Sequence, residues 1–267
     1  MGTTDTPKPL WASGDAYEPY VGRWSRMVAP EFIRWLAVPD GMHWLDVGCG
    51  TGALSQTILN LVDPRKVKGF DRSDAFVEYA RHQVIDPRVD FEIGDAQALP
   101  VEADTFDATV SGLVLNFVPR PEQMIAEMRR AVRTGGVVAL YIWDYAGKMQ
   151  MMRHFWNAAA ALDPAARDLD EGRRFPRCNP ASLQDLVQSA GLSQVQVRAI
   201  DISTDFNGFD DFWSPFLRGQ APAPAYAMSL SEEKRAQLRE RLYNSLPFAL
   251  DGSIPLVARA WAVRGVK

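Results

Sequence analysis

From residue 43 onward, short runs of apolar and β-branched residues alternate with longer segments whose apolar positions recur every three or four residues. The short runs are typical of buried strands, and the longer segments are typical of helices with one apolar face. The alternation predicts an α/β fold in which a mostly parallel sheet carries helices on both faces. Strands are predicted at 43–47, 67–70, 89–93, 106–111, 137–143, 195–202 and 256–263.

Helix boundaries follow from capping residues and glycines. Ser73 is the expected N-cap of the helix after the second strand, which carries Phe76 inward. The helix that begins at Pro119 and Pro121 is expected to end at Gly135-Gly136, before the fifth strand. Further helices are predicted at 53–61, 148–162, 182–190 and 231–246.

The pattern divides the chain into one domain with two insertions, since 267 residues suit one α/β domain with a cap. The expected parts are a tail with covering helices (1–40), a cofactor-binding half (41–146), a lid insertion (147–180) and a second sheet half (181–267), which contains an inserted cap segment (205–255). The two insertions are the expected place of substrate specificity. The aromatic stretch in 205–255 is interpreted as packing, with an acceptor wall as the alternative. Its members are Phe206, Phe209, Phe212, Trp213 and Phe216.

The run 44–52, Trp-Leu-Asp-Val-Gly-Cys-Gly-Thr-Gly, predicts a buried strand that enters a glycine turn and then opens a helix. Such a turn brings backbone N–H groups close to a ligand. The spacing Gly48-x-Gly50-x-Gly52 differs from the dinucleotide fingerprint Gly-x-Gly-x-x-Gly, and Asp46 would repel a pyrophosphate and attract a cation. An NAD-dependent oxidoreductase is therefore the weaker alternative.

These residues resemble the first motif of the class I S-adenosylmethionine-dependent methyltransferases, (Asp/Glu)-x-Gly-x-Gly-x-Gly. The resemblance covers about residues 40–145 and continues through 106–111, 115–118 and 128–136, in the manner of the ubiquinone and menaquinone methyltransferase branch. It implies a Rossmann-like, doubly wound sheet of seven strands whose last strand is antiparallel, with a helical lid from the insertions. It also implies S-adenosyl-L-methionine as cofactor.

Acids at the ends of the next two strands extend the site. Asp71 follows Gly48 at the interval where a carboxylate meets ribose hydroxyls, and Asp95 takes the position that the resembling family uses for the adenine amino group. For each acid alone, helix capping or turn chemistry is the competing interpretation. The resemblance further implies that the segment around Tyr20 folds over the cofactor and that an arginine near it meets the methionine carboxylate. The candidate cofactor-binding residues are Tyr20, Arg23, Arg26, Asp46, Gly48, Gly50, Gly52, Asp71, Arg72, Asp95, Ala96 and Ser111.

Methyl transfer needs alignment more than catalytic side chains, so few groups are obligatory. The general-base candidates are Asp144, Tyr145 and His154, which follow the fifth strand. His154 is the best titrating candidate among them, and a surface or packing residue of an amphipathic lid helix is its alternative interpretation. The resembling branch often carries histidine near 116 and 117, whereas this chain has Asn116-Phe117. The histidines show no metal-ligand spacing, so no metal is expected.

Composition limits the kinds of partner and the cellular compartment that we expect for this chain. A net charge of −4 disfavours a nucleic-acid partner, and two distant cysteines indicate a reducing compartment, the cytoplasm. Cys49 is interpreted as a small apolar filler. No apolar run is long enough to span a membrane.

The expected function is methyl transfer to a small, largely apolar metabolite, at oxygen or carbon, with a non-catalytic cofactor-binding protein as a further alternative. The oligomeric state is left open.

Overall fold

The computed structural model describes residues 23–218 and 221–267, which contain a seven-stranded sheet of order β3-β2-β1-β4-β5-β7-β6. The neighbours from β3 to β5 pair in parallel, whereas β7 is antiparallel to both β5 and β6. This arrangement confirms the predicted α/β class and the antiparallel last strand. The strands are β1 (His43–Val47), β2 (Lys66–Asp71), β3 (Val89–Ile93), β4 (Phe106–Gly112), β5 (Val132–Trp143), β6 (Ser193–Ser203) and β7 (Val257–Val266).

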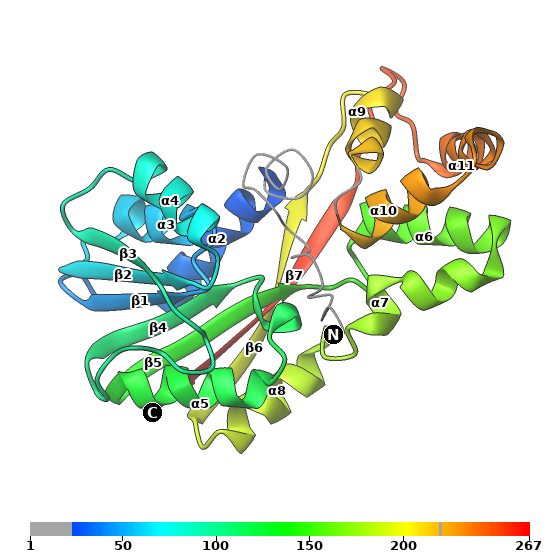
Figure 1. Cartoon of the computed structure of the whole chain (residues 1–267). Helices are drawn as coiled ribbons and strands as arrows, with labels where there is room; N and C mark the ends of the chain where they lie inside the picture. The colour runs from blue at the N-terminus through cyan, green and yellow to red at the C-terminus, as the bar shows by residue number, and fades with distance from the viewer. Residues whose placement is uncertain (1–22, 219–220) are drawn as a thin grey trace, which may run out of the picture.

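Helices cover both faces of the sheet. Figure 1 shows α2 (Arg23–Leu36), α3 (Ala53–Leu61) and α4 (Asp74–Gln83) on one face, and α5 (Pro121–Ala131) with α8 (Pro180–Ser189) on the other. Successive strand residues point to opposite faces, so Trp44 of β1 lies in the core beneath α2 and α3, while Leu45 lies in the core beneath α5. Ser73 accepts a hydrogen bond from the Phe76 N–H at 3.4 Å, which confirms the predicted N-cap of α4.

One predicted helix end is wrong. α5 ends at Ala131 and β5 begins at Val132, so Gly135 and Gly136 lie inside the strand instead of ending the helix. The Gly135 N–H donates to the Lys267 carbonyl at 2.9 Å, and the Lys267 N–H donates to the Gly136 carbonyl at 3.1 Å. The partner lies at the far end of the chain, and this pairing extends the strand past the glycines.

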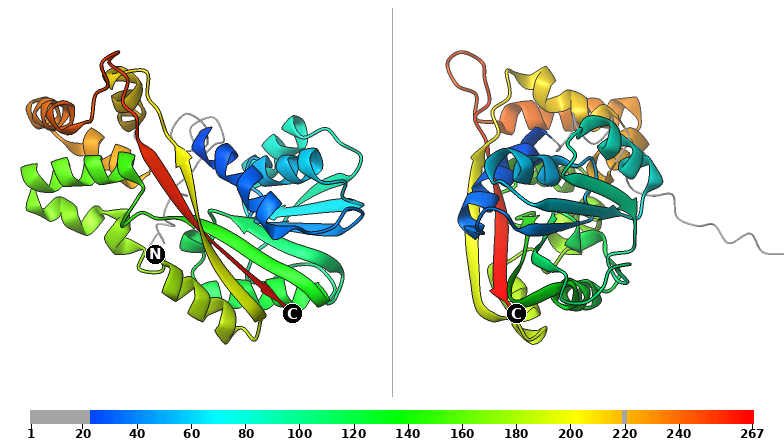
Figure 2. Two further views of the ribbon diagram at one scale, coloured as in Figure 1. Left: turned by 180° about the vertical axis from the view of Figure 1, so that it is seen from behind. Right: turned by 90° about the vertical axis from the view of Figure 1, so that its left-hand side faces the viewer.

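The remaining helices form a cap beyond the ends of β6 and β7, as both views show (Figures 1 and 2). We use the word cap for residues 149–174 and 209–245. It contains α6 (Gln150–Leu162), η3 (Pro164–Leu169), α7 (Glu171–Arg174), α9 (Phe209–Trp213), η4 (Ser214–Leu217), α10 (Pro222–Ser229) and α11 (Glu232–Ser245). α6 packs against both α10 and α11, so the two insertions share one core, and this core continues into the core on the α2 face of the sheet. A further short helix, η2 (Leu115–Phe117), follows β4.

Aromatic rings fill that core. Phe155 of α6 stacks on Phe216 of η4 with ring centroids 4.4 Å apart, and Phe212 lies 5.6 Å from Phe216. All five members of the predicted aromatic stretch are buried. The structure therefore supports the packing interpretation of this stretch.

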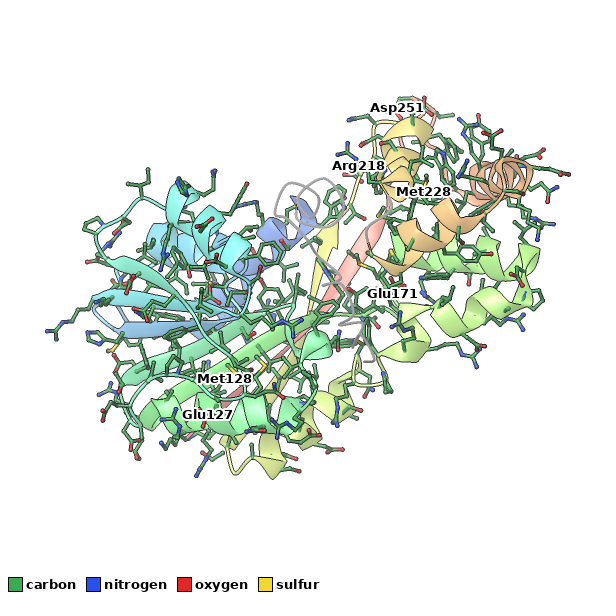
Figure 3. All side chains as sticks on the ribbon, in the orientation of Figure 1. Glu127, Met128, Glu171, Arg218, Met228 and Asp251 are labelled. Carbon is green, nitrogen blue, oxygen red and sulfur yellow. The ribbon has the colours of Figure 1, made fainter. Side chains whose placement is uncertain are left out.

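Glu171 lies where the cap meets the sheet (Figure 3) and belongs to a small polar cluster. The Glu171 carboxylate is 3% exposed and accepts a hydrogen bond from the Trp156 indole N–H. Next to it, Arg153 forms an ion pair with Asp170. Because Arg153 is matched by Asp170, burial dominates at Glu171 and raises the pKa of its carboxyl from 4.5 to about 7.

Candidate functional site

The glycine turn at the end of β1 forms the base of the site. The N–H groups of Gly48 and Cys49 both donate to the Phe70 carbonyl, at 2.7 and 2.9 Å, so the turn is held against β2. Gly48 has φ +73°, and a Cβ built there would lie 2.5 Å from a Val114 methyl carbon. Only glycine allows both this left-handed backbone and this close approach. Gly52, at φ +80°, is the N-cap of α3, so the helix N-terminus opens directly from the turn.

Asp46 lies behind the turn and is 1% exposed. Its Oδ2 accepts a hydrogen bond from the Ser55 hydroxyl of α3 at 2.7 Å, whereas its Oδ1 has no hydrogen-bond partner among the described residues. Burial raises the pKa of Asp46 to about 7, against the lowering effect of the Ser55 hydrogen bonds. A buried carboxylate oxygen without a donor is costly, and a cationic donor in the adjoining cavity would satisfy it.

Asp71, at the end of β2, accepts hydrogen bonds from backbone N–H groups of the neighbouring turns, as the competing interpretation of this residue predicted. Its Oδ2 accepts from the Gly50 N–H at 3.0 Å and its Oδ1 from the Ser73 N–H at 2.9 Å. Burial raises the pKa of this carboxyl, and the two backbone hydrogen bonds oppose that effect. A carboxylate has about four acceptor positions, so these contacts leave room for a ligand hydroxyl.

Asp95 lies after β3 and is exposed. Its Oδ1 accepts hydrogen bonds from the Gln97 backbone N–H at 2.9 Å and the Gln97 side-chain amide at 3.2 Å. Both Asp95 and Asp71 line the same cavity as Asp46 and the glycine turn. The structure thus brings the three predicted acids to one edge of the sheet, where parallel strands end and open α/β sheets collect ligands.

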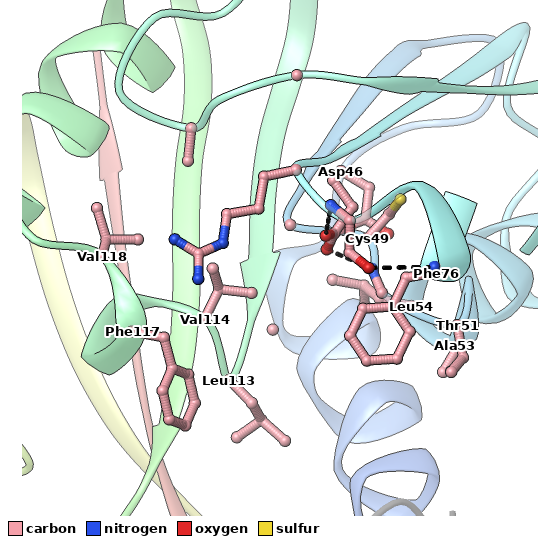
Figure 4. A pocket seen from close by; sticks show the side chains of 18 of the residues that line it. Asp46, Cys49, Thr51, Ala53, Leu54, Phe76, Leu113, Val114, Phe117 and Val118 are labelled. Atoms are coloured by element: carbon pink, nitrogen blue, oxygen red, sulfur yellow. Dashed lines mark hydrogen bonds between the residues drawn. The ribbon is translucent and has the colours of Figure 1, made fainter. Parts of the chain in front are cut away.

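The cavity has a volume of about 230 Å³ and one largely apolar side. Figure 4 shows Leu113, Val114 and Phe117, from the segment after β4, across from Phe76 of α4. Leu113 has φ +63°, an unfavourable backbone for a non-glycine residue, and its N–H donates to the Tyr141 carbonyl at 2.8 Å. Such strain persists where the surroundings enforce it, often beside a ligand site.

The other cofactor candidates separate into three groups. Gly50, Arg72 and Ala96 line the cavity. Ser111 lies outside the cavity lining: it is buried, and its hydroxyl donates to the Val47 carbonyl at 2.7 Å, which joins β4 to β1. Its role as a cofactor contact stays a prediction. Tyr20 lies outside the described residues, as does the side chain of Arg23, and Arg26 is exposed on α2.

The three general-base candidates lie outside the lining of this cavity. Asp144 accepts from the Gly147 and Lys148 N–H groups at 3.0 and 2.9 Å, so it stabilises the turn into α6. Tyr145 packs on Phe175 with ring centroids 5.5 Å apart. His154 is half-buried on α6, and burial lowers its pKa. A catalytic role for each of them stays a prediction.

Three residues that line the cavity were not predicted as site residues from the sequence. Phe76 was predicted to face the core but lines the cavity, and Gln97 and Val114 carried no motif of their own. A partial signal existed for Gln97, because it closely follows Asp95. Cys49 is buried in the cavity wall, and burial raises the pKa of its thiol, consistent with the filler interpretation.

Comparison with known proteins gives matches to methyltransferases. A family model described as methyltransferase domain matches residues 45–140. Methyltransferase GfsG of Streptomyces halstedii is 31% identical over 208 residues, 76% of this chain and 71% of the relative. The 2-methyl-6-phytyl-1,4-hydroquinone methyltransferase 1 of Oryza sativa subsp. japonica is 38% identical over 100 residues, 38% of this chain and 30% of the relative.

A solved structure shows the same fold at low identity. Phosphoethanolamine N-methyltransferase 2 of Haemonchus contortus, in complex with S-adenosyl-L-methionine, has a TM-score of 0.57 and 17% identity, over 95% of this chain and 56% of that one. The chain spans between 30% and 55% of the length of the first curated relatives that it matches. In the described residues, each helix is too short or too polar to cross a membrane. The match to GfsG over most of both chains, together with the glycine turn and the sheet, shows that the chain belongs to the methyltransferase family.

Proposed function

We propose that the chain transfers the methyl group of S-adenosyl-L-methionine to a small, largely apolar acceptor, at oxygen or carbon. The observation that carries the proposal is the unpartnered Oδ1 of Asp46, buried beside a glycine turn in a cavity at the carboxyl edge of the sheet. An ammonium group satisfies that oxygen and neutralises that charge, whereas a pyrophosphate would be repelled by it. The site therefore fits an amino-acid sulfonium nucleoside better than NAD.

The remaining lining residues fit the other parts of the same cofactor. Asp71 keeps acceptor capacity for ribose hydroxyls, and Asp95 offers an acceptor to the amino group of the base. Gly48 and Gly50 let the backbone approach the ligand, and Ala96 and Arg72 border the base end. Gly52 belongs to the proposed site as the N-cap that opens α3 from the turn. Tyr20, Arg23 and Arg26 are assigned to the amino-acid end of the cofactor from the family resemblance alone.

The cofactor supplies a methyl group on a positively charged sulfur, which a nucleophile displaces in line. The protein contributes position and exclusion of water, and orientation alone accounts for about 7 to 11 kcal/mol of such barriers. Leu113, Val114 and Phe117 supply the apolar wall that keeps water away, and the three carboxylates of the lining, Asp46, Asp71 and Asp95, are assigned to the cofactor.

The acceptor class rests on that apolar wall and on the relatives. One relative is named for a phytylated hydroquinone and another for trans-aconitate, both small metabolites. The net charge of −4 offers little attraction to a nucleic-acid backbone. We place the reaction in the cytoplasm, on a free metabolite.

Calorimetric titration with S-adenosylhomocysteine tests the proposal, with NAD as the competing ligand. The wild-type chain is expected to bind S-adenosylhomocysteine and not NAD. Asp46→Asn is expected to weaken binding about 30-fold or more, because it removes the charge that pairs with a buried ammonium. Asp63→Asn, at a side chain that is 81% exposed, is the matched control and should leave affinity unchanged. Tight NAD binding, or an Asp46→Asn variant with wild-type affinity, would reject the proposal.

Turnover is tested separately, by incubating the chain with methyl-labelled cofactor and a set of hydroquinones and carboxylic acids. Labelled product is expected from at least one apolar member of the set. Cofactor binding with no labelled product from a full metabolite extract would favour the non-catalytic alternative.

A further inference from the structure

Asp95 is an exposed loop residue whose carboxylate is nevertheless held in one orientation. The carboxylate of such a residue normally rotates freely, yet here the side-chain amide of Gln97 donates to Oδ1 at 3.2 Å and to Oδ2 at 3.4 Å. The Gln97 backbone N–H adds a third donor to Oδ1 at 2.9 Å. Gln97 is itself only 8% exposed and lines the cavity.

The orientation of the Gln97 amide is set from its other end. Its Oε1 accepts hydrogen bonds from the Arg120 backbone N–H at 3.1 Å and from the Arg120 Nε at 3.3 Å. Both Arg120 groups only donate, so the amide oxygen must face Arg120 and the NH₂ group must face Asp95. A flipped amide would place donor against donor at Arg120 and acceptor against carboxylate at Asp95. Arg120, Gln97 and Asp95 therefore form a chain with one direction of hydrogen bonding, which we call the 120–97–95 clamp.

The clamp fixes what the cavity can recognise. Most protein donors to the carboxylate fall on Oδ1, so Oδ2 keeps its acceptor capacity. An acceptor-only oxygen attracts an exocyclic amino group and repels an exocyclic carbonyl oxygen. Polar sites of this kind reject a mismatched ligand strongly, because the mismatched pair loses its hydrogen bond and stays desolvated.

We propose that Gln97 is the positioning residue that makes this site select a purine with a 6-amino group over one with a 6-oxo group. The inference rests on the proposed function and adds to it a determinant of base specificity outside the glycine motif. Gln97 acts through Asp95 and its neighbour Arg120, without contact of its own with the reacting atoms.

The test compares two ligands that differ at one position, S-adenosylhomocysteine and S-inosylhomocysteine, by calorimetric titration. The wild-type chain is expected to prefer the amino ligand about 100-fold or more. Gln97→Met keeps the length of the side chain and removes both ends of the clamp, so the preference should fall about tenfold or more. Gln184→Met, at an exposed position on α8, is the matched control and should keep the wild-type preference.

A second variant acts on the clamp from the surface and does not disturb the buried amide. Arg120→Ala removes the guanidinium donor and keeps the backbone donor, so it should lower the preference by a smaller factor than Gln97→Met does. Thermal melting checks that both variants remain folded.

The outcomes separate this inference from the proposed function. A wild-type chain that binds neither ligand rejects the proposed function. A wild-type chain that binds S-adenosylhomocysteine but shows no preference rejects the base selection alone. If Gln97→Met or Arg120→Ala weakens both ligands by the same factor, Gln97 is a structural residue only and the inference is wrong.

Discussion

Cofactor affinity should depend on pH through Asp46. Its buried carboxyl has a pKa of about 7, raised from 3.8, so half of the ligand-free molecules carry a neutral Asp46 near neutral pH. An ammonium ligand needs the charged form. The titration with S-adenosylhomocysteine should therefore weaken as the pH falls below 7.

The size of the effect follows from the proton equilibrium. Below a pKa of about 7, each pH unit lowers the charged fraction about tenfold, which equals about 1.4 kcal/mol of binding free energy. At pH 5.5 the dissociation constant should be roughly 30 times its value at pH 7.5, and binding should release about one proton. The Ser55 hydrogen bond is already formed in the free protein, so it does not offset this difference.

Titration calorimetry at pH 5.5, 6.5 and 7.5, in buffers of different ionisation enthalpy, measures both the affinity and the proton release. Asp46→Asn cannot ionise, so its weaker affinity should be flat across this range, whereas Asp63→Asn should follow the wild-type slope. If wild type and Asp46→Asn show the same slope, Asp46 does not carry the ligand charge and the reasoning fails.

Three further predictions concern other parts of the structure. Burial raises the pKa of Glu171 from 4.5 to about 7, so the stability present below the unfolded-state pKa is lost as the pH rises through about 7. Glu171→Gln stays neutral, so its free energy of unfolding in urea should exceed that of wild type by up to about 3 kcal/mol at pH 8. Parallel pH curves for the two proteins would contradict this prediction. Gly48→Ala should destabilise the fold by about 1 to 3 kcal/mol more than Gly50→Ala, because only Gly48 faces a side chain at 2.5 Å while both have positive φ; equal melting temperatures would show that Val114 moves away at no cost. His154→Gln should leave S-adenosylhomocysteine affinity unchanged, because His154 lies outside the cavity lining, and a loss beyond tenfold would show that the cap contacts the cofactor.

The parts of the fold that the sequence predicted well depend on neighbouring residues. β1, α3 and β3 occur at the predicted bounds, because each is a short apolar run or amphipathic segment between clear turn signals. The end of α5 was wrong because β5 continues through two glycines by pairing with Lys267, a residue that no local pattern connects to them. Local patterns therefore predicted which elements occur, whereas pairing with a distant residue determined where α5 ends and β5 begins.

The same division holds at the site. Asp46 was predicted from the glycine motif that contains it, and Asp71 and Asp95 were predicted because they lie at or just after the ends of parallel strands, which share an edge. The structure places Ser111 outside the cavity lining, because the direction of its side chain depends on the pleat of β4, which turns the hydroxyl toward Val47. Gln97 was missed because its importance comes from Arg120, which no sequence spacing connects to it.

The placement of polar groups indicates which functions belong to the sheet with its loops and which belong to the cap. All the described residues that line the cavity come from positions 25–141, so the charged contacts expected for the cofactor belong to the sheet and its loops. The aromatic side chains of the cap pack on one another and join the hydrophobic core on the α2 face of the sheet, and the Glu171 carboxylate lies where the cap meets the sheet. No described residue of the cap lines the cavity, so the surface residues of the cap can change without altering the acids at the strand ends. This division agrees with the prediction that acceptor specificity resides in the two insertions, and it is the pattern expected when function resides in sites built on a shared fold.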